Sequence, residues 1–333
     1  MKKILLISTG GTIASMPSSD GLVPQIDSKK LLEYLNFTKL NFKIDTINLF
    51  NVDSTDMQPE HWLKIKDEIK NNYNKYDGFV ITHGTDTMAY TASALSYLIQ
   101  NSKKPIVLTG AQKSIDMDIT DAKNNLLNSL IYASKEKSSG ITIVFNGKVI
   151  AGTRARKERT KSFDAFTSIN FPFLAIIQDE KVYRYITDRN NEKEVKFFDN
   201  LNTNVFVLKL IPSLTPKILD EIFKNYDAII IESYGVGGIP KIIETKLKEL
   251  VQTYNNEKII IMTTQVPQEG SDIGVYEVGK RISSISYLEA HDMTIESTVT
   301  KIMWILGNFD FKFTEIENEF YRKINYDMIF NEK

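Results

Sequence analysis

Residues Lys2–Ala14 have the sequence KKILLISTGGTIA, and this stretch decides the fold class. Four consecutive apolar residues, Ile4–Ile7, run directly into a loop that contains two adjacent glycines. A continuous apolar run, as opposed to an alternating one, predicts a strand that is covered on both faces, as in a parallel sheet. Similar short runs recur along the chain, at Gly78–Thr82, Ile106–Thr109, Ile141–Phe145, Val205–Leu210, Ala228–Ile231 and Lys258–Met262.

Segments with helical periodicity lie between several of these predicted strands. In Pro59–Tyr73, the side chains of Trp62, Ile65 and Ile69 fall on one stripe, and Thr87–Ile99 shows the same spacing of apolar residues. Strands that alternate with helices predict an α/β fold built on a parallel sheet.

The length of 333 residues favours two domains, because it exceeds what one hydrophobic core ordinarily holds. Residues 188–204 interrupt the strand–helix rhythm with a polar stretch rich in asparagine and charge, which is typical of a linker. We therefore expect a larger N-terminal parallel-sheet domain at residues 1–187 and a smaller C-terminal α/β domain at residues 205–333.

The charge balance argues against nucleic acid as a partner. Lysine and arginine number 41 and aspartate and glutamate 42, so the formal net charge is −1 and no basic field is available for a phosphate backbone. The chain has no cysteine, which excludes disulfides, thiolate nucleophiles and cysteine-ligated metals.

The N-terminal segment favours a cytoplasmic location. Lys2 and Lys3 precede an apolar run that is too short for the core of a signal peptide. No stretch of the sequence approaches the ~20 apolar residues that are needed to span a bilayer, so no membrane association is expected.

Three polar loops directly follow predicted strands, at Thr9–Ala14, His83–Met88 and Thr109–Gln112. Because ligands of open parallel sheets bind beyond the carboxyl ends of the strands, the three loops are expected to line one site. Taken singly, each loop also has a structural explanation, since Gly-Gly makes tight turns and Thr85 or Asp86 would cap the helix that follows.

Several other kinds of catalytic machinery are missing from the sequence. Neither a P-loop nor a G-x-G-x-x-G fingerprint follows the first strand, and no G-x-S-x-G elbow or H-E-x-x-H motif occurs. The three histidines are scattered along the chain, so neither a metal site nor a cofactor is expected.

Together, the loops TGGTIA at Thr9–Ala14 and HGTDTM at His83–Met88 resemble the paired signatures of the bacterial L-asparaginase family. The resemblance extends over nearly the whole chain, and Ser233–Gly237 and the run through Met88–Tyr90 are more similar to the cytoplasmic, type I branch than to the secreted branch. It implies hydrolysis of L-asparagine to L-aspartate and ammonia through a threonine nucleophile and a β-aspartyl intermediate. Further matching segments are Asp53–Met57, Asp77–Val80, Thr85–Leu95, Thr109–Gln112 and Asp292–Thr294.

The resemblance assigns catalytic roles to four residues. Thr12 matches the nucleophile, Thr85 the second catalytic threonine, Asp86 the catalytic aspartate and Lys157 the catalytic lysine. Because a threonine hydroxyl is barely ionised at neutral pH, another group must take its proton. We expect Lys157 to polarise Thr85, which then helps to activate the nucleophile or the attacking water. By itself, a lysine in the basic run Thr153–Lys157 would be interpreted as a solvated cation.

The substrate-binding residues are also implied by the resemblance. Asp86 is expected to pair with the α-ammonium group, and Ser54 to hold the α-carboxylate with Thr55 beside it. Ala111 would offer its backbone carbonyl to the side-chain amide. From the residues alone, Ser54 and its neighbour Asp53 would instead cap the helix that begins near Pro59, and both interpretations can hold together.

The developing oxyanion also needs donors, and the backbone N–H groups of Thr12 and Thr85 are expected to supply them because both lie in turns at strand ends.

Two positions depart from the family pattern. Leu22 stands where the flexible segment after the nucleophile usually carries a tyrosine, and a leucine cannot hydrogen-bond or carry a proton. Another hydroxyl would have to substitute for it, such as Ser15, Ser18 or Tyr234 from a neighbouring subunit, or the activity is lower. Arg156 stands where some type I members have a threonine of a regulatory site, which argues against allostery here.

Three alternatives to a dedicated asparaginase stay open. One is a broader asparaginase–glutaminase, and another is the amidase subunit of a tRNA-dependent amidotransferase, which shares these motifs. The third is a non-catalytic sensor of asparagine or aspartate, supported by Leu22 alone. Members of the family are dimers or dimers of dimers, so the resemblance implies a homodimer or a homotetramer.

Overall fold

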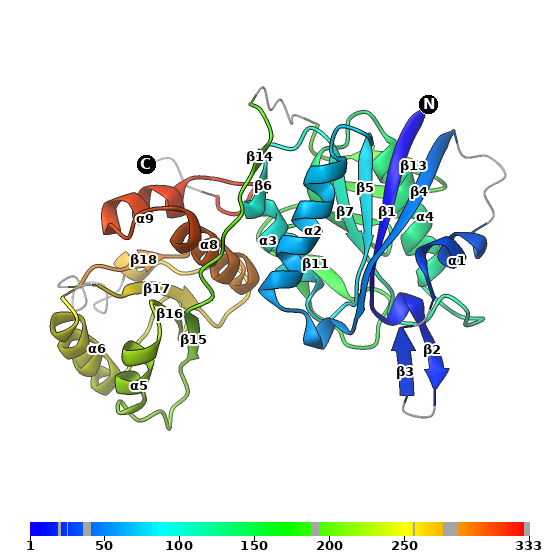
Figure 1. Cartoon of the computed structure of the whole chain (residues 1–333). Helices are drawn as coiled ribbons and strands as arrows, with labels where there is room; N and C mark the ends of the chain where they lie inside the picture. The colour runs from blue at the N-terminus through cyan, green and yellow to red at the C-terminus, as the bar shows by residue number, and fades with distance from the viewer. Residues whose placement is uncertain are drawn as a thin grey trace. The chain divides into compact units, whose positions relative to one another are not determined.

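The structure of the chain is a computed structural model, and it describes residues 1–18, 21–24, 26–35, 41–187, 193–255, 257–275 and 285–329. The expected fold class is confirmed: a large α/β unit with a mostly parallel sheet precedes a smaller α/β unit (Figure 1). The chain divides between Asp199 and Asn200, and the short segment Ile324–Tyr326 belongs to the first unit.

The first unit is built on a sheet of eight described strands in the order β13-β12-β9-β8-β7-β5-β1-β4. The five strands from β8 to β4 run parallel to one another, whereas β9, β12 and β13 add an antiparallel edge. Their bounds are β1 Lys2–Gly10, β4 Phe42–Val52, β5 Gly78–Thr82, β7 Pro105–Thr109, β8 Gly140–Phe145, β9 Lys148–Ala151, β12 Ala175–Gln178 and β13 Lys181–Arg184.

The central strands end level with one another, and this places the polar loops at one edge of the sheet. Ser8 of β1 pairs with Thr82 of β5, and Thr82 pairs with Thr109 of β7. The three loops that the sequence singled out therefore leave the sheet from neighbouring positions at its carboxyl edge.

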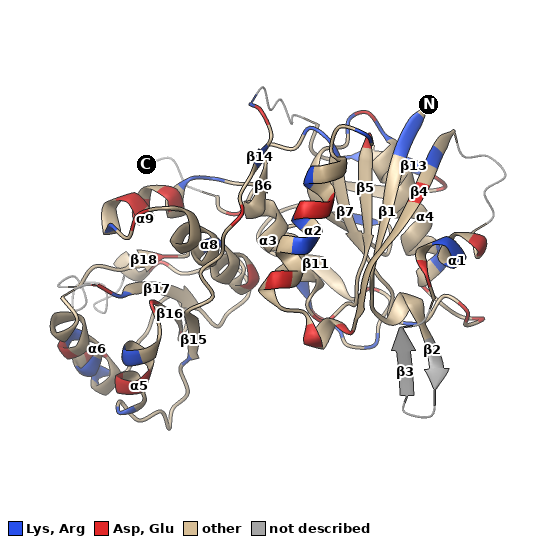
Figure 2. Cartoon of the chain, in the orientation of Figure 1, with Lys and Arg blue, Asp and Glu red and all other residues tan. Residues whose placement is uncertain are grey.

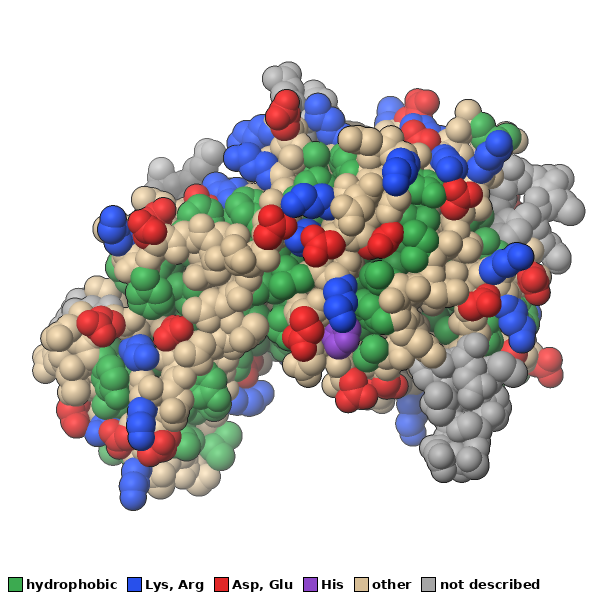
Figure 3. Space-filling model, viewed as in Figure 1, with side chains coloured by type: hydrophobic (Ala, Val, Ile, Leu, Met, Phe, Trp, Pro, Cys, Tyr) green, Lys and Arg blue, Asp and Glu red, His purple; other side chains and the backbone are tan. Residues whose placement is uncertain are grey.

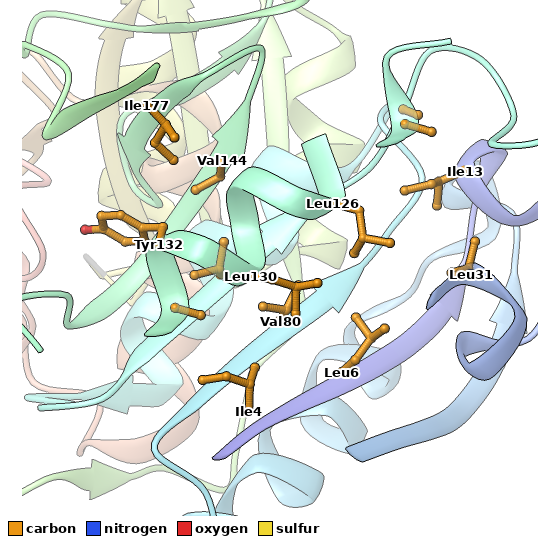
Figure 4. Packing of buried hydrophobic residues seen from close by; sticks show 14 of the residues in the cluster. Ile4, Leu6, Ile13, Leu31, Val80, Leu126, Leu130, Tyr132, Val144 and Ile177 are labelled. Carbon is orange, nitrogen blue, oxygen red and sulfur yellow. The ribbon is translucent and has the colours of Figure 1, made fainter. Parts of the chain in front are cut away.

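Helices cover both faces of this sheet. α1 and α4 pack on one face, where Leu6 of β1 and Val80 of β5 lie in one buried cluster with Leu126 and Leu130 of α4 (Figure 4). α2 and α3 lie on the opposite face (Figure 1). The helix bounds are α1 Ser28–Glu33, α2 Pro59–Asn72, α3 Met88–Leu98 and α4 Ala122–Ser134.

The start of α2 differs from the expected cap. Pro59 occupies the first turn, where its missing N–H costs no hydrogen bond, and the backbone N–H of Gln58 donates to Nδ1 of His61 at 3.0 Å. Asp53 instead caps the separate 3₁₀ turn Ser54–Asp56 by accepting from the backbone N–H of Thr55. The expectation that Ser54 and Asp53 cap the helix near Pro59 was therefore wrong.

Shorter strands complete the first unit. An antiparallel pair of these strands, β10 with β11, presents Lys157 at the end of β10, opposite Phe166. The bounds are β2 Ser15–Ser18 paired with β3 Gly21–Pro24, β6 Ile99–Gln100 paired with β14 Lys196–Phe197, and β10 Ala155–Lys157 paired with β11 Phe166–Ser168.

The second unit repeats the strand–helix logic on a parallel sheet of four described strands, in the order β15-β16-β17-β18. Its core joins the apolar runs of the strands to the buried stripes of α5 and α6. The bounds are β15 Val205–Lys209, α5 Ile218–Asn225, β16 Ala228–Ser233, α6 Lys241–Thr253, β17 Ile259–Thr264, β18 Leu288–Glu289, α8 Ile295–Asn308 and α9 Phe313–Tyr321.

The return of Ile324–Tyr326 to the first unit was not part of the expected division at residues 188–204. Asn325 is anchored through its side-chain amide, which donates to the Oγ of Ser96 at 2.9 Å and to the carbonyl of Ile141 at 3.0 Å. Its own carbonyl accepts from the hydroxyl of Thr153 at 2.6 Å. These are ordinary polar contacts, and no apolar periodicity in the sequence predicts them.

Charges of both signs are interspersed on the face of the molecule that Figures 2 and 3 show. Figure 2 shows lysine and arginine next to aspartate and glutamate along α2, and on the face seen in Figure 3 neither sign forms a continuous field. Among the described helices, none is long and apolar enough to cross a membrane.

Candidate active site

The loops after β1 and β5 pack backbone against backbone, and two glycines make this possible. Gly11 has a φ of +82°, and a Cβ there would lie 2.3 Å from the backbone nitrogen of Gly84. A Cβ on Gly84 would in turn lie 2.6 Å from the side chain of Ser54. Thr12 and Thr85, the residues that follow these glycines, therefore extend from two backbones in direct contact.

Thr85, Asp86 and Lys157 form one hydrogen-bonded group. Nζ of Lys157 donates to Oγ1 of Thr85 at 2.7 Å and to Oδ1 of Asp86 at 2.6 Å. The side chain of Lys157 is 15% exposed and that of Asp86 57%, so the lysine is the inner partner and the carboxylate faces outward. The structure thus brings together three of the four catalytic residues that the sequence predicts, and it places the carboxylate where a soluble cation can reach it.

The short hairpin of β10 and β11 presents Lys157 to this group. Because side chains alternate along a strand, Arg156 points to the opposite face of β10 from Lys157. Arg154 is fully buried, and its Nε donates to the carbonyl of Tyr326. Therefore neither Arg154 nor Arg156 points with Lys157 toward Thr85.

Ser54 lies against the backbone of the Thr85 loop. Its hydroxyl accepts from the backbone N–H of Asp86 at 3.3 Å, and its carbonyl accepts from the hydroxyl of Thr87 at 2.7 Å. Thr55 is exposed, and its hydroxyl donates to Oδ1 of Asp53 at 2.7 Å. Ser54 is therefore next to Asp86, whereas the hydroxyl of Thr55 is committed to its own turn.

Thr12 begins the 3₁₀ turn Thr12–Ala14 and is partly buried. Within the described part of the chain, its hydroxyl has no hydrogen-bond partner, in contrast to that of Thr85. The turn is held in place by Ser15, whose Oγ donates to the carbonyl of Gly11 at 3.1 Å, and by the backbone N–H of Ile115, which donates to the carbonyl of Ile13. The hydroxyl of Thr12 thus lies on a fixed backbone, without a hydrogen-bond partner among the described residues.

Ala111 is buried in the third loop, which packs on the second. A Cβ on Gly110 would lie 2.3 Å from the carbonyl oxygen of His83, and the backbone N–H of His83 donates to the carbonyl of Thr109 at 2.8 Å. The third loop is therefore in contact with the Thr85 loop, as the strand order requires.

The buried side chain of His83 supports the backbone of the Thr85 loop. Its Nδ1 lies 2.6 Å from the carbonyl oxygen of Gly84 and its Nε2 lies 2.8 Å from the hydroxyl of Thr91. Because a carbonyl oxygen only accepts, Nδ1 carries the proton and Nε2 accepts from Thr91. Burial lowers the pKa of His83 to about 4, so the ring is neutral at pH 7 and serves as a structural support.

Gln112 is a member of this site for which the sequence predicted no role. Its Oε1 lies 3.2 Å from the Oγ1 of Thr85. The sequence contained the relevant signal, because Gln112 closes the loop motif that follows β7, but a neutral amide carries no obvious catalytic chemistry.

Among the described residues, no group of three or more His, Asp or Glu side chains is arranged to hold a metal ion.

Comparisons with known proteins decide the family. Residues 3–190 match the family model described as "Asparaginase, N-terminal", and residues 204–320 match the "Glutaminase/Asparaginase C-terminal domain". The chain belongs to the asparaginase family. Members of this family are amidohydrolases, and the chain is an enzyme of this class.

Individual relatives of the chain carry two different names. An L-asparaginase from Thermococcus kodakarensis is 39% identical over 92% of this chain and 93% of its own length. A subunit of the glutamyl-tRNA(Gln) amidotransferase from Methanosphaera stadtmanae is 37% identical over 93% of this chain and 73% of its own length. The likeness therefore extends to archaeal proteins and is not confined to a bacterial branch.

Solved structures agree with this assignment. The thermostable L-asparaginase from Thermococcus kodakarensis superposes with a TM-score of 0.92 at 36% identity, over 99% of this chain and 100% of that one. A probable cytoplasmic L-asparaginase from Campylobacter jejuni superposes with a TM-score of 0.82 at 25% identity, over 97% of this chain and 100% of that one.

Proposed function

We propose that the protein is an L-asparaginase, which hydrolyses L-asparagine to L-aspartate and ammonia with Thr12 as nucleophile. The observation that carries this proposal is the contact of Lys157 with both Thr85 and Asp86, beside the loop of Thr12. A site that only bound an amino acid would need the charges but not two threonine hydroxyls and a lysine. This argues against the sensor.

Substrate recognition follows from the charges and donors of the site. The outward carboxylate of Asp86 pairs with the α-ammonium group of asparagine, and Ser54, with Thr55 beside it, binds the α-carboxylate. The backbone carbonyl of Ala111 accepts a hydrogen bond from the side-chain amide of the substrate. Both charges and the amide of the zwitterion are thereby matched.

The reaction proceeds in two steps. In the first, the Oγ1 of Thr12 attacks the side-chain carbonyl carbon while Thr85 helps to activate it, the proton of Thr12 ends on the departing nitrogen, and ammonia leaves a β-aspartyl ester on Thr12. In the second, water attacks the ester carbon, its proton returns to Thr12, and aspartate is released. Backbone N–H groups of Thr12 and Thr85 stabilise the oxyanion in both steps, and Lys157 polarises Thr85.

Ammonia release from the purified protein tests this function. The proposal predicts turnover of L-asparagine by the protein alone, and parallel rates with L-glutamine distinguish a dedicated asparaginase from an asparaginase–glutaminase. Release that depends on a partner subunit and a charged tRNA would favour the amidotransferase alternative that the relative from Methanosphaera stadtmanae raises. Binding of asparagine without any ammonia release would identify a sensor.

We infer a cytoplasmic, type I asparaginase that forms a homodimer or a homotetramer and has no nucleic-acid or membrane partner. The matching Ser233–Gly237 motif and the likeness to the probable cytoplasmic enzyme support the branch. Light scattering of the purified protein tests the assembly, and a monomer at micromolar concentration would contradict it.

A further inference from the structure

The orientation of the Gln112 amide is fixed by its neighbours. Nε2 lies 3.3 Å from the carbonyl oxygen of Arg159 and 3.2 Å from that of Ser162. Carbonyl oxygens only accept hydrogen bonds, so the NH2 group faces them and Oε1 faces Thr85. Because the amide oxygen also only accepts, the hydroxyl of Thr85 must donate its proton to Gln112 across the 3.2 Å contact.

This contact determines how the Thr85 hydroxyl is used. A hydroxyl has one proton and two lone pairs. The proton is directed at Gln112 and one lone pair accepts from Lys157 at 2.7 Å. A single lone pair is left, and its direction is set by the other two contacts. The hydroxyl of the nucleophile or a water can donate a hydrogen bond to Thr85 at this one position.

The backbone of Gln112 is itself firmly held. Its N–H and that of Lys113 donate to the carboxylate of Asp121, which is 6% exposed, at distances of 2.9 Å and 3.1 Å. The side-chain amide of Asn125 donates to the carbonyl of Gly110 at 3.0 Å. The backbone position of Gln112 is therefore fixed, and this places its side-chain amide within hydrogen-bonding distance of Thr85.

The two carbonyls that Gln112 binds belong to the turn that follows Lys157. Arg159 and Ser162 lie between β10 and β11, where the backbone N–H of Arg159 donates to the carbonyl of Ala165. One amide group thus contacts the hydroxyl of Thr85 and the hairpin that presents Lys157.

We propose that Gln112 is a positioning residue for the amidohydrolase reaction, which directs the Thr85 hydroxyl and holds the Lys157 hairpin against it. The inference rests on the proposed function, because it assigns a consequence for turnover. Gln112 acts through Thr85 and through the hairpin that carries Lys157. Its loss should therefore slow the chemical steps while leaving the groups that bind the substrate charges in place.

Gln112→Met tests this, since methionine fills a similar volume but cannot accept or donate these hydrogen bonds. The expected result is a fall in kcat of about 10- to 100-fold, the range for misplacement of a catalytic group by roughly 1 Å, with KM for asparagine within about twofold. Gln100→Met is the matched control, because Gln100 is a buried glutamine of the same unit whose Nε2 donates to the carbonyl of Tyr97. It should keep kcat within about twofold.

The pH profile of Gln112→Glu separates positioning from general support of the fold. A neutral carboxylic acid can donate one hydrogen bond and accept another, whereas a carboxylate can only accept and would face the carbonyls of Arg159 and Ser162. The ratio of variant kcat to wild-type kcat should therefore rise as the pH falls toward the ordinary carboxyl pKa of about 4.3. A ratio that stays constant with pH would overturn the assignment.

The outcomes also separate this inference from the proposed function. A wild-type protein that releases no ammonia from asparagine overturns both. An active wild type with an equally active Gln112→Met variant overturns the inference alone, as does a loss that Gln100→Met reproduces in full.

Discussion

Nζ of Lys157 lies 2.7 Å from Oγ1 of Thr85, although 72 residues separate them along the chain. The pair meets because β5 delivers Thr85 to the carboxyl edge of the sheet, while the hairpin of β10 and β11 brings Lys157 to the same edge. The same lysine contacts Asp86, so one amine orients a hydroxyl and a carboxylate at once.

Removal of either catalytic hydroxyl should abolish turnover without unfolding the protein. Thr12→Ala removes the nucleophile and Thr85→Val removes the hydroxyl that Lys157 contacts, and each should lower kcat by at least about 10³-fold. Ammonia release and thermal denaturation, measured on the same samples, check activity and fold separately. Either variant with a near-normal rate would show that its role is assigned to the wrong residue.

Lys157→Met should lower kcat by about 10²-fold or more, because Thr85 and Asp86 lose their shared partner. Lys246→Met is a matched control, since Lys246 also pairs with two carboxylates, those of Asp220 and Glu249, on the surface of the second unit. Surface ion pairs contribute little to stability, so this control should retain activity. Equal rates for the two variants in steady-state assays would refute the role of Lys157.

Gly11→Ala should separate the loops of Thr12 and Thr85. The added Cβ would lie 2.3 Å from the nitrogen of Gly84, at a φ of +82° that alanine rarely adopts. We expect a loss of more than about 2 kcal/mol in the free energy of unfolding, with a large fall in kcat. Gly235→Ala measures the cost of the backbone conformation alone. Gly235 has a φ of +53°, and beyond its chain neighbours no described residue has an atom within 4 Å of an added Cβ. Chemical denaturation that gives the two variants equal losses would contradict the close approach.

His83 should make stability fall between pH 6.5 and pH 4. Burial lowers the pKa of His83 to about 4 in the folded protein, against an ordinary value of 6.5. Between these two pH values the imidazole is protonated in the unfolded chain but neutral in the folded protein, so stability is lost as the pH falls. The shift corresponds to about 3 kcal/mol. His83→Gln does not titrate there. The free energy of unfolding of the wild type minus that of the variant should therefore decrease by this amount as the pH falls, and a constant difference would count against the buried neutral ring.

Leu22→Tyr tests the departure from the family pattern in the segment Gly21–Pro24. The side chain of Leu22 lies outside the described part of the structure, so this prediction rests on the sequence. A tyrosine hydroxyl supplied there should raise kcat or leave it unchanged. A large loss in the ammonia assay would mean that the segment has been rebuilt around leucine.

The fold was accessible from the sequence because its central strands are continuous apolar runs, and β1, β5 and β7 are each followed by a polar loop. The antiparallel edge of β9, β12 and β13 was not predicted. β12 and β13 are only partly buried, and the direction of all three short strands depends on partners that sequence periodicity does not report. The return of Ile324–Tyr326 to the first unit was not predicted either, because single polar contacts such as those of Asn325 produce no periodicity in the sequence.

The candidate site, too, could be predicted from the sequence only in part. The positions of Thr12, Thr85 and Asp86 follow from the strand order. That of Lys157 required the resemblance, because a lysine in a basic run is typical of a solvated surface. Gln112 went without a role because its importance lies in two long-range contacts, one to Thr85 and one to the turn after Lys157.

A crystal structure with L-aspartate, the product of the proposed reaction, tests the central claim most directly. We expect its α-ammonium group within hydrogen-bonding distance of Asp86 and its side-chain carboxylate between the hydroxyls of Thr12 and Thr85. Aspartate bound elsewhere, or with its side chain directed away from both threonines, would contradict the account.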